Sequence, residues 1–330
     1  MTNNYILVTD YMPNDGSRDV SGDIQKLIDK NPNRTIYFPD GLYRLDNPIC
    51  TPAHPKKSVD LQLSGYAVLQ AGENWSSDEA MVRLGAIHPA NDIMTIGSNY
   101  GFAGGIVDGQ NKARGISIDG GRETTIHNVS IKHTTVGIHI KHGANSGSSD
   151  ADITQVNIVG SGDTGSIGVL VEGYDNTFTN MRIAHVYVGM MLCSSGNCIR
   201  NVHPLYTSDY TDYEGSCGFW DKNGNNWYDY AYSDHFSTGF RTAGHISSTY
   251  NDCFTMWYSP REKAHVAFAA EGKFTSVVTN LRIGYNGREA DNRVLKVGED
   301  GGSGVFQNLF YDTNVVDDQA HMKYLVGKIL

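Results

Sequence analysis

Two short motifs alternate along this chain, and their spacing is the feature that most restricts its fold. The first motif has the form apolar–x–Asn–apolar–x–apolar. It occurs at Ile126–Ile131, Phe178–Ile183, Ile199–Pro204, Val278–Ile283 and Phe306–Tyr311, and weaker copies place Gln155, Asp229 and Asp252 at the asparagine position. Successive copies are 21 to 28 residues apart. A repeat of this length without low complexity indicates a solenoid, in which each period forms one structural unit.

The second motif is a glycine followed by alternating apolar residues. It occurs at Gly115–Ile118, Gly137–Ile140, Gly168–Val171, Gly189–Leu192, Gly218–Trp220 and Gly239–Arg241, with glycine-free copies at Val266–Phe268 and Val294–Val297. Each period therefore holds at least two short strands and has no room for a crossover helix, which excludes a TIM barrel or a doubly wound sheet. The LxxLxL spacing of a leucine-rich repeat is absent. The repeat predicts an all-β chain whose periods are the coils of a parallel β-helix.

The repeat also suggests a division of the chain. Residues 1–330 are expected to form one β-helix domain, with an N-terminal cap and first strands over 1–46, coils over about 47–316 and a C-terminal cap over 317–330. Apolar residues at helical spacing predict a capping helix over Ser21–Asp29, because an open first coil needs its sheet edge covered. Two strands are expected about the Pro-Asp-Gly turn within Thr35–Leu45. We expect the repeated asparagines to point inward and bond to their copies in neighbouring coils.

The stretch Asp15–Ile28, followed by Ile36–Leu45, resembles the opening of the pectate-lyase-like superfamily. That superfamily includes polysaccharide lyases, glycoside hydrolases, fructan-cleaving transferases and phage tailspike depolymerases. The resemblance implies a right-handed helix with three sheets, in which the glycine-led strands form the first sheet and the substrate lies on its outer face. No lyase or polygalacturonase catalytic signature is present, so the resemblance assigns no catalytic residue.

Alternation along the glycine-led strands identifies the residues that face outward. Trp220 and Arg241 are expected side by side on adjacent coils, where the ring would offer a flat face to a sugar and the guanidinium would hold a carboxylate or hydroxyls. Other outward positions carry Ser117, Asp119, His139, Lys141 and Glu172, of which His139 and Lys141 are interpreted as a surface ladder. The long loops before Trp220 and Arg241 add acids, aromatics and a histidine to the same coils. This convergence indicates a functional site.

The predicted function is hydrolysis of glycosidic bonds in a poly- or oligosaccharide, with one carboxyl group as proton donor and a second carboxylate that activates water or attacks carbon. The candidate catalytic residues are Asp212, Glu214, Asp234, His235 and Arg241. The candidate substrate-binding residues are Trp220, Tyr206, Tyr210, Tyr213, His245 and Arg261. Two alternatives stay open: a polysaccharide lyase that acts by β-elimination on a uronate, and a non-catalytic glycan-binding or tailspike-type protein that forms a homotrimer.

Charge and composition limit the partners. A formal net charge of −10 argues against non-specific binding to nucleic acid. There is neither an apolar run long enough to span a membrane nor a signal peptide, which is compatible with a cytoplasmic protein, a virion component or a secreted protein whose leader has been removed. The five cysteines are expected to be mostly buried thiols. No cofactor is predicted: acidic loops could hold a calcium ion through oxygen ligands, but no loop has the spacing of a known calcium motif.

Overall fold

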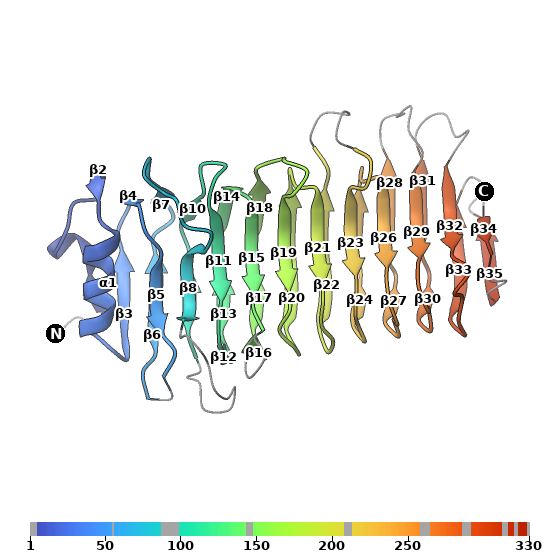
Figure 1. Cartoon of the computed structure of the whole chain (residues 1–330), viewed down its shortest axis with the longest axis horizontal. Helices are drawn as coiled ribbons and strands as arrows, with labels where there is room; N and C mark the ends of the chain where they lie inside the picture. The colour runs from blue at the N-terminus through green and yellow to red at the C-terminus, as the bar shows by residue number, and fades with distance from the viewer. Residues whose placement is uncertain are drawn as a thin grey trace. The chain divides into compact units, whose positions relative to one another are not determined.

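The chain folds as a right-handed parallel β-helix with one short N-terminal helix, as the sequence predicts (Figure 1). The computed structural model describes residues 5–54, 56–86, 99–142, 148–207, 213–257, 265–285, 292–311, 316–319 and 323–328. Contacts divide the chain into two units, which are treated separately below. Unit 1 comprises Met1–Ser161 and Glu172–Asn176, and unit 2 comprises Gly162–Val171 and Thr177–Leu330.

In unit 1 every coil contributes strands to three runs of parallel strands. The first run is β5 (Ile49–Pro52), β8 (Ala80–Ala86), β11 (Arg114–Ile118) and β15 (Val136–Ile140). The second run is β1 (Tyr5–Leu7), β3 (Arg34–Phe38), β6 (Val59–Leu63), β9 (Gly101–Ala103), β13 (Thr125–His127) and β17 (Asp152–Thr154). The third run is β2 (Asp15–Asp19), β4 (Gly41–Leu45), β7 (Ala67–Ala71), β10 (Ile106–Asp108), β14 (Ser130–Thr134) and β18 (Asn157–Gly160). A short pair, β12 (Gly121–Arg122) and β16 (Ser148–Ser149), lies outside these runs.

Two helical segments precede the regular coils of unit 1. A single 3₁₀ turn, η1, spans Val8–Asp10, and the predicted capping helix is α1 (Ser21–Lys30). Ile24, Leu27 and Ile28 of α1 are buried, as the helical spacing requires. The strands β3 and β4 flank the Pro-Asp-Gly turn as expected, but they do not pair with each other, because each pairs in parallel with a strand of the next coil.

Unit 2 repeats the same coil. Its first run is β19 (Ile167–Val171), β21 (Val188–Leu192), β23 (Cys217–Asp221), β26 (Thr238–Thr242), β29 (Val266–Ala270), β32 (Arg293–Val297) and β34 (Val316–Asp318). The long strands β20 (Thr177–Ala184), β22 (Cys198–Leu205) and β33 (Val305–Tyr311) pass through both remaining runs, as does β35 (Lys323–Lys328). In the other coils the second and third runs are formed by separate strands. The second run contains β24 (Trp227–Asp229), β27 (Thr249–Asn251) and β30 (Val277–Thr279), and the third run contains β25 (Tyr232–Asp234), β28 (Phe254–Trp257) and β31 (Arg282–Tyr285).

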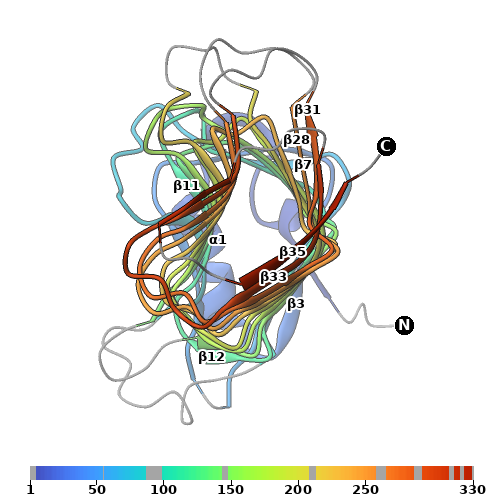
Figure 2. The same cartoon turned by 90° about the vertical axis from the view of Figure 1, so that its right-hand side faces the viewer.

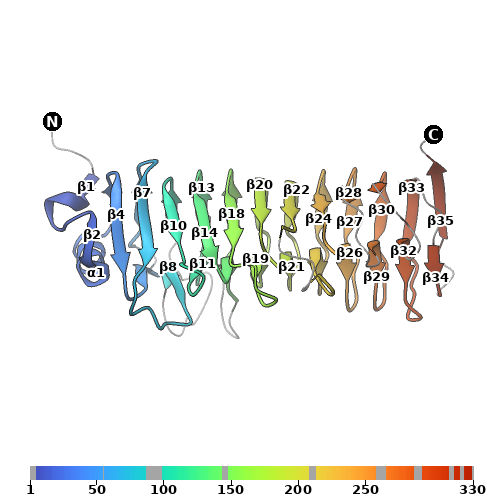
Figure 3. The same cartoon turned by 90° about the horizontal axis from the view of Figure 1, so that it is seen from above.

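The figures make the parallel stacking of unit 2 visible. Figure 3 shows β22, β24, β27 and β30 side by side, in the order of their pairing. Seen from the C-terminal end in Figure 2, β28 and β31 lie together on one side of the coil, and β33 and β35 on another. Because β34 and β35 pair with the coil before them, coil pairing continues through residues 316–319 and 323–328, beyond the predicted boundary at 316. Whether the chain behaves as one domain remains a prediction.

The interior of unit 2 is filled by the residues that follow the motif glycines. Phe219, Phe240 and Phe268 occupy the same inward position on successive strands of the first sheet. Their ring centroids are 5.0 and 6.0 Å apart and the rings are nearly parallel. At the motif glycine of β26, Gly239, an added Cβ would lie 2.6 Å from the Oγ1 atom of Thr255. The glycine therefore allows the opposing strand to approach closely.

The repeated asparagines form the corner between the second and third runs. Asn180 and Asn201 have φ values of 55° and 51°, in the left-handed region that asparagine tolerates better than most residues. The Nδ2 atom of Asn201 donates a hydrogen bond of 2.7 Å to Oδ1 of Asn180, and Asn308 donates in the same way to Asn280 at 3.1 Å. The predicted stacking is confirmed. The predicted inward direction is wrong, because Asn180, Asn201 and Asn308 are exposed.

A different set of polar residues stacks inside unit 2. Asn197 and Asn226 are buried, and the backbone N–H of Asn197 donates a hydrogen bond of 3.0 Å to Oδ1 of Asn226. The backbone N–H of Asn226 in turn donates to Oγ of Ser248 at 3.0 Å. In the coil that contains Asn226, the left-handed corner position is held by Tyr230, with φ 53°. The repeat had placed Asp229 at that position, which is wrong by one residue.

Candidate functional site

The outer face of the first sheet in unit 1 carries two columns of polar side chains. Arg83, Ser117 and His139 occupy matching outward positions on β8, β11 and β15. Just past the ends of β11 and β15, the backbone N–H groups of Asp119 and Lys141 donate to the carbonyl oxygens of the preceding coils at 2.8 and 2.9 Å, and the N–H of Glu172 donates to Ile140 at 2.8 Å. The parallel pairing therefore continues beyond the strands and holds the second column in register.

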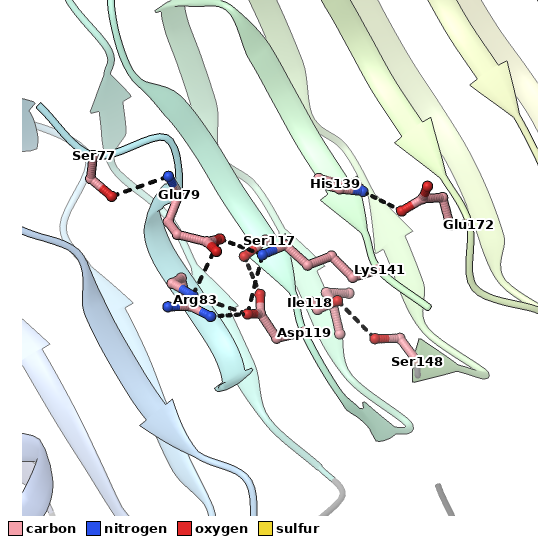
Figure 4. Close-up of polar contacts among 10 residues, drawn as sticks. All are labelled: Ser77, Glu79, Arg83, Ser117, Ile118, Asp119, His139, Lys141, Ser148 and Glu172. Atoms are coloured by element: carbon pink, nitrogen blue, oxygen red, sulfur yellow. Dashed lines mark hydrogen bonds and ion pairs between the residues drawn. The ribbon is translucent and has the colours of Figure 1, made fainter. Parts of the chain in front are cut away.

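Three of these charged side chains, Arg83, Asp119 and Lys141, form one connected network with Glu79, which we call the charged network (Figure 4). Arg83 donates to Oδ2 of Asp119 through Nη2 at 2.5 Å and Nε at 2.9 Å. Lys141 contacts Glu79 and lies 3.3 Å from Oδ2 of Asp119. The hydroxyl of Ser117 donates to Oδ1 of Asp119. Asp119 is thus contacted from three sides, and its side chain is only 6% exposed.

A second pair lies beside the charged network. Nε2 of His139 is 2.7 Å from Oε2 of Glu172, and Nδ1 of His139 is buried without a hydrogen-bond partner among the described residues. Burial lowers the pKa of His139, although the carboxylate of Glu172 opposes this shift. The imidazole is therefore neutral at pH 7, with its Nε2–H directed at Glu172 in the tautomer that satisfies this contact.

Two carboxylates of this face are open to solvent. The side chains of Glu79 and Glu172 are 42% and 43% exposed. Partial burial would raise the pKa of Glu79, but Lys141 and Arg83 outweigh it and hold the pKa below its ordinary value. Glu79 is therefore ionised at neutral pH, where it can accept a hydrogen bond or a proton.

In unit 2 the predicted pair of Trp220 and Arg241 lies as the sequence indicates. The two residues are register partners on β23 and β26. The guanidinium of Arg241 lies over the Trp220 ring, with Cζ 4.4 Å from the ring centroid, and Lys222 Nζ lies 5.0 Å from it. Arg241 also contacts Glu271, through Nη2 at 2.9 Å and Nε at 3.0 Å. The ring is therefore shared with cations instead of forming an open platform.

The predicted residues Asp234 and His235 form a buried pair. Oδ1 of Asp234 is 2.5 Å from Nδ1 of His235, and Nε2 of His203 lies 3.5 Å from Oδ2 of Asp234. Burial would raise the pKa of Asp234, but the two histidines outweigh it and the pKa lies below its ordinary value. Asp234 is 2% exposed, so it is an ionised group suited to orienting His235 and poorly placed to donate a proton to substrate.

The other predicted residues are spread over different environments. Glu214 is exposed, and its carbonyl oxygen accepts a hydrogen bond from the Tyr187 hydroxyl. His245 is exposed. Asp212, Tyr210 and Arg261 lie outside the described residues.

Tyr206 and Tyr213 do not form the expected stacking surface. They are only 2% and 1% exposed, and their ring centroids are 5.9 Å apart in an edge-to-face contact. The hydroxyl of Tyr213 donates to the carbonyl oxygen of Phe236 at 3.1 Å. Both rings therefore pack inside the turn before β26, and the prediction that they stack on a substrate is corrected.

Sequence reasoning did not identify Glu79 or Arg83, because β8 lacks the motif glycine that marks β11 and β15. The sequence did hold a signal: Glu79 and Arg83 have opposite charges and stand four residues apart, on either side of the apolar run Ala80–Val82. His203 was also missed, since its partner Asp234 is distant in sequence.

Among the described residues no cluster of three or more histidines, cysteines or acids could hold a metal ion. Within the same ranges, no helix combines the length and the apolar character needed to cross a membrane.

Comparison with known proteins places the chain in a family. Residues 5–207 match the family model described as rhamnogalacturonase A/epimerase, pectate lyase-like. No curated protein matches the sequence.

Solved structures share the fold at low sequence identity. ORF18 of Geobacillus virus E2 has a TM-score of 0.65 at 14% identity, over 99% of this chain and 62% of that one. PfbA, a surface adhesin of Streptococcus pneumoniae, has a TM-score of 0.64 at 14% identity, over 98% of this chain and 92% of that one. A tailspike mutant of E. coli bacteriophage HK620, in complex with a pentasaccharide, has a TM-score of 0.72 at 11% identity, over 98% of this chain and 65% of that one. The chain thus spans less than two thirds of the two viral proteins.

The family match covers more than half of the chain and agrees with the coil structure seen here. The chain belongs to the rhamnogalacturonase A/epimerase, pectate lyase-like family.

Proposed function

We propose that the protein hydrolyses glycosidic bonds of a poly- or oligosaccharide on the outer face of the first sheet in unit 1. The observation that carries this proposal is the presence of two solvent-exposed carboxylates, Glu79 and Glu172, with Asp119 held between cations on the same face. Paired carboxyl groups are what acid/base hydrolysis of a glycosidic bond requires. Family membership and the pentasaccharide complex of the HK620 tailspike support a glycan as the substrate.

The two exposed acids have different surroundings, as the two roles demand. Glu79 is kept ionised by Lys141 and Arg83, which suits the residue that activates water or attacks carbon. Glu172 shares a 2.7 Å contact with His139, a neutral and nearly buried imidazole. We assign the proton-donating role to Glu172, whose exposed carboxyl group faces a neutral imidazole, whereas the cations beside Glu79 favour its ionised form.

The acids named from the sequence remain a second proposal for the position of the reaction. Glu214 is exposed and precedes Trp220, while Asp234 orients His235. In that arrangement Glu214 would act with His235, and Arg241 would bind substrate. The same His235–Asp234 pair, with Arg241 holding a uronate, would serve the alternative β-elimination.

Turnover of a broad glycan panel, measured by new reducing ends and by absorbance of unsaturated products, tests these proposals. Hydrolysis predicts reducing ends without absorbance, reduced about 10²-fold or more in Glu79→Gln and in Glu172→Gln. The matched variant Glu214→Gln keeps activity if the reaction occurs in unit 1 and loses it if the sequence-based placement is right. Product absorbance would establish the lyase instead.

A non-catalytic glycan-binding protein is the second candidate function. It is favoured by the likeness to the adhesin PfbA and by the ion pairs that hold Asp119 and Glu79 in the resting protein. This candidate predicts binding to one of the glycans without turnover of any. The homotrimer expected from the sequence is a separate proposal, and light scattering of the purified chain measures it.

A further inference from the structure

We infer that the sugar units lying against the charged network are neutral or amino sugars and not uronates. The inference rests on the proposed function, since it concerns the substrate of the same face, and it gives that substrate a chemical class. The inference follows from two observations: the cations of this face are already paired with protein carboxylates, and exposed carboxylates remain accessible to a ligand.

The cations of the charged network are committed to carboxylates of the protein. Both Nε and Nη2 of Arg83 bond to Asp119, and Nε also lies 3.7 Å from Glu79. Lys141 contacts Glu79 and Asp119. The side chains of Arg83 and Lys141 are only 21% and 24% exposed. A uronate carboxylate could pair with them only by displacing a protein carboxylate, which would leave a partly buried charge without its partner.

The groups that remain open are acceptors. Glu79 and Glu172 are each exposed by roughly two fifths and present carboxylate oxygens. Carboxylates accept hydrogen bonds from sugar hydroxyls and attract an ammonium group, whereas they repel a uronate carboxylate at the same distance. Within the charged network, the two carboxylates of Glu79 and Asp119 balance the two cations Arg83 and Lys141, so no positive charge is left over for a uronate.

His139 adds a second observation that points to a ligand with donor groups. The residue is 8% exposed, and its Nδ1 has no partner in the described part of the chain. In the tautomer that donates Nε2–H to Glu172, this Nδ1 is an acceptor. A buried polar atom without a protein partner marks a position where a water or ligand group is needed. A hydroxyl or water beside Nδ1 would meet that need, and a carboxylate would not.

One further cation acts on this face from a separate position. Arg114 contributes to the lowered pKa of His139, but it pairs in register with Ala80 at the start of β11, whereas Asp119 follows the end of that strand. The inference therefore concerns the sugar units at the charged network.

Binding and turnover by the full chain test the inference separately from the function. The probes are a neutral oligosaccharide series, a series of oligomers of glucosamine and oligogalacturonates, titrated by calorimetry at low and at 0.5 M salt. We expect neutral or glucosamine oligomers to bind at least about tenfold more tightly than oligogalacturonates. Glucosamine binding that weakens with salt identifies an amine, and salt-independent binding of the neutral series identifies hydroxyls.

The variant Glu172→Lys supplies the charge-specific test. It should reverse the preference, with oligogalacturonate binding gained and glucosamine binding lost by about tenfold or more. Asp229→Lys, which changes a carboxylate on β24 of unit 2, is the matched control and should leave the preference unaltered. Equal thermal melting of both variants and the parent shows that the fold is intact.

The outcomes separate the two ideas. Preferred binding or cleavage of oligogalacturonates by the parent chain would overturn the inference and leave the hydrolase proposal standing. Preferred binding of neutral or amino oligomers without turnover would support the inference and overturn hydrolysis. Absence of binding to all three series would overturn both.

Discussion

The guanidinium of Arg241 covers the ring of Trp220 one coil away, with 4.4 Å between Cζ and the ring centroid. Glu271 holds the same guanidinium on the next coil, at 2.9 Å from Nη2. The three side chains form a continuous line of contacts across adjacent strands of the first sheet in unit 2. A cation over an indole ring contributes about 0.5–1 kcal/mol at a partly exposed site.

A double-mutant cycle can measure this contact. Trp220→Leu and Arg241→Met, made singly and together, should give a coupling free energy of about 0.5–1 kcal/mol in urea unfolding. The comparison cycle pairs Trp220→Leu with Lys222→Met. Its coupling should be smaller, because Lys222 lies further from the ring and is more exposed. A coupling of zero for Trp220 and Arg241 would mean that their contact does not stabilise the fold.

The fold and the neighbouring positions of Trp220 and Arg241 could be predicted because both depend on alternation along strands. Inward and outward positions follow from a period of two, and the repeat length sets which residues become neighbours. This logic also placed Asp119, Lys141 and Glu172 on the outer face. It could not show that Arg83 and Lys141 both pair with Asp119, since those contacts depend on the length and direction of side chains.

Two of the incorrect predictions concern a loop and the corners between runs, where alternation gives no direction. Tyr206 lies at the start and Tyr213 near the end of the long loop between β22 and β23, and both turn inward to contact Phe236 and each other. Asn201 and the asparagines at the same position in other coils were assigned to the interior. Their left-handed backbone conformation cannot be recognised from the pattern of apolar residues. Asparagine is used at both kinds of position in this chain, so residue type alone does not separate them.

The corner residue Tyr230 offers a direct test of the left-handed assignment. It has φ 53° and is 56% exposed, whereas five other coils place asparagine at this corner, for example Asn201 and Asn280. We expect Tyr230→Asn to raise the free energy of unfolding by about 0.5–1 kcal/mol, because asparagine tolerates this region better. Tyr66→Asn is the control, since Tyr66 is more exposed but is absent from the left-handed residues. A destabilised Tyr230→Asn would show that the ring has packing contacts that outweigh the backbone.

Asp234 should give the protein an acid-dependent loss of stability. Its pKa is lower in the folded protein than the ordinary value of 3.8, so the unfolded chain binds more protons between these two pKa values. The stabilising contribution of Asp234 is complete above the ordinary pKa and disappears as the pH falls through the folded pKa. In Asp234→Asn this pH dependence should be absent, with a loss of about 1–3 kcal/mol at pH 6.

Urea unfolding between pH 2 and 6 checks this expectation. The difference between the parent and Asp234→Asn should shrink as the pH decreases. Asp229→Asn removes a more exposed carboxylate, 3.4 Å from Arg200, and should cost no more than about 1 kcal/mol. A difference between the parent and Asp234→Asn that stays constant over this pH range would contradict the lowered pKa.

Asp221, which is buried in unit 2, should give the free energy of unfolding the opposite pH dependence. It is 1% exposed, and burial raises its pKa, although it accepts hydrogen bonds from Ser248 at 2.6 Å, Asn226 at 3.2 Å and Tyr250 at 3.2 Å. Because the folded pKa lies above the unfolded one, the folded state binds more protons in the window between them. Its contribution is therefore present below the ordinary pKa of 3.8 and is lost as the pH rises through the folded pKa.

Replacing this carboxylate by an amide should remove that loss. Asp221→Asn keeps the shape, and the hydroxyls of Ser248 and Tyr250 can rotate to accept from its Nδ2. We expect the variant to be more stable than the parent at pH 7, by on the order of 1 kcal/mol, and the advantage to vanish toward pH 4. Asp221→Leu separates charge from hydrogen bonding, because it leaves the donor of Asn226 unsatisfied and should cost about 1–3 kcal/mol. Urea unfolding at both pH values decides the matter: an Asp221→Asn protein less stable than the parent at pH 7 would mean that the buried carboxylate is ionised and stabilised by its three donors.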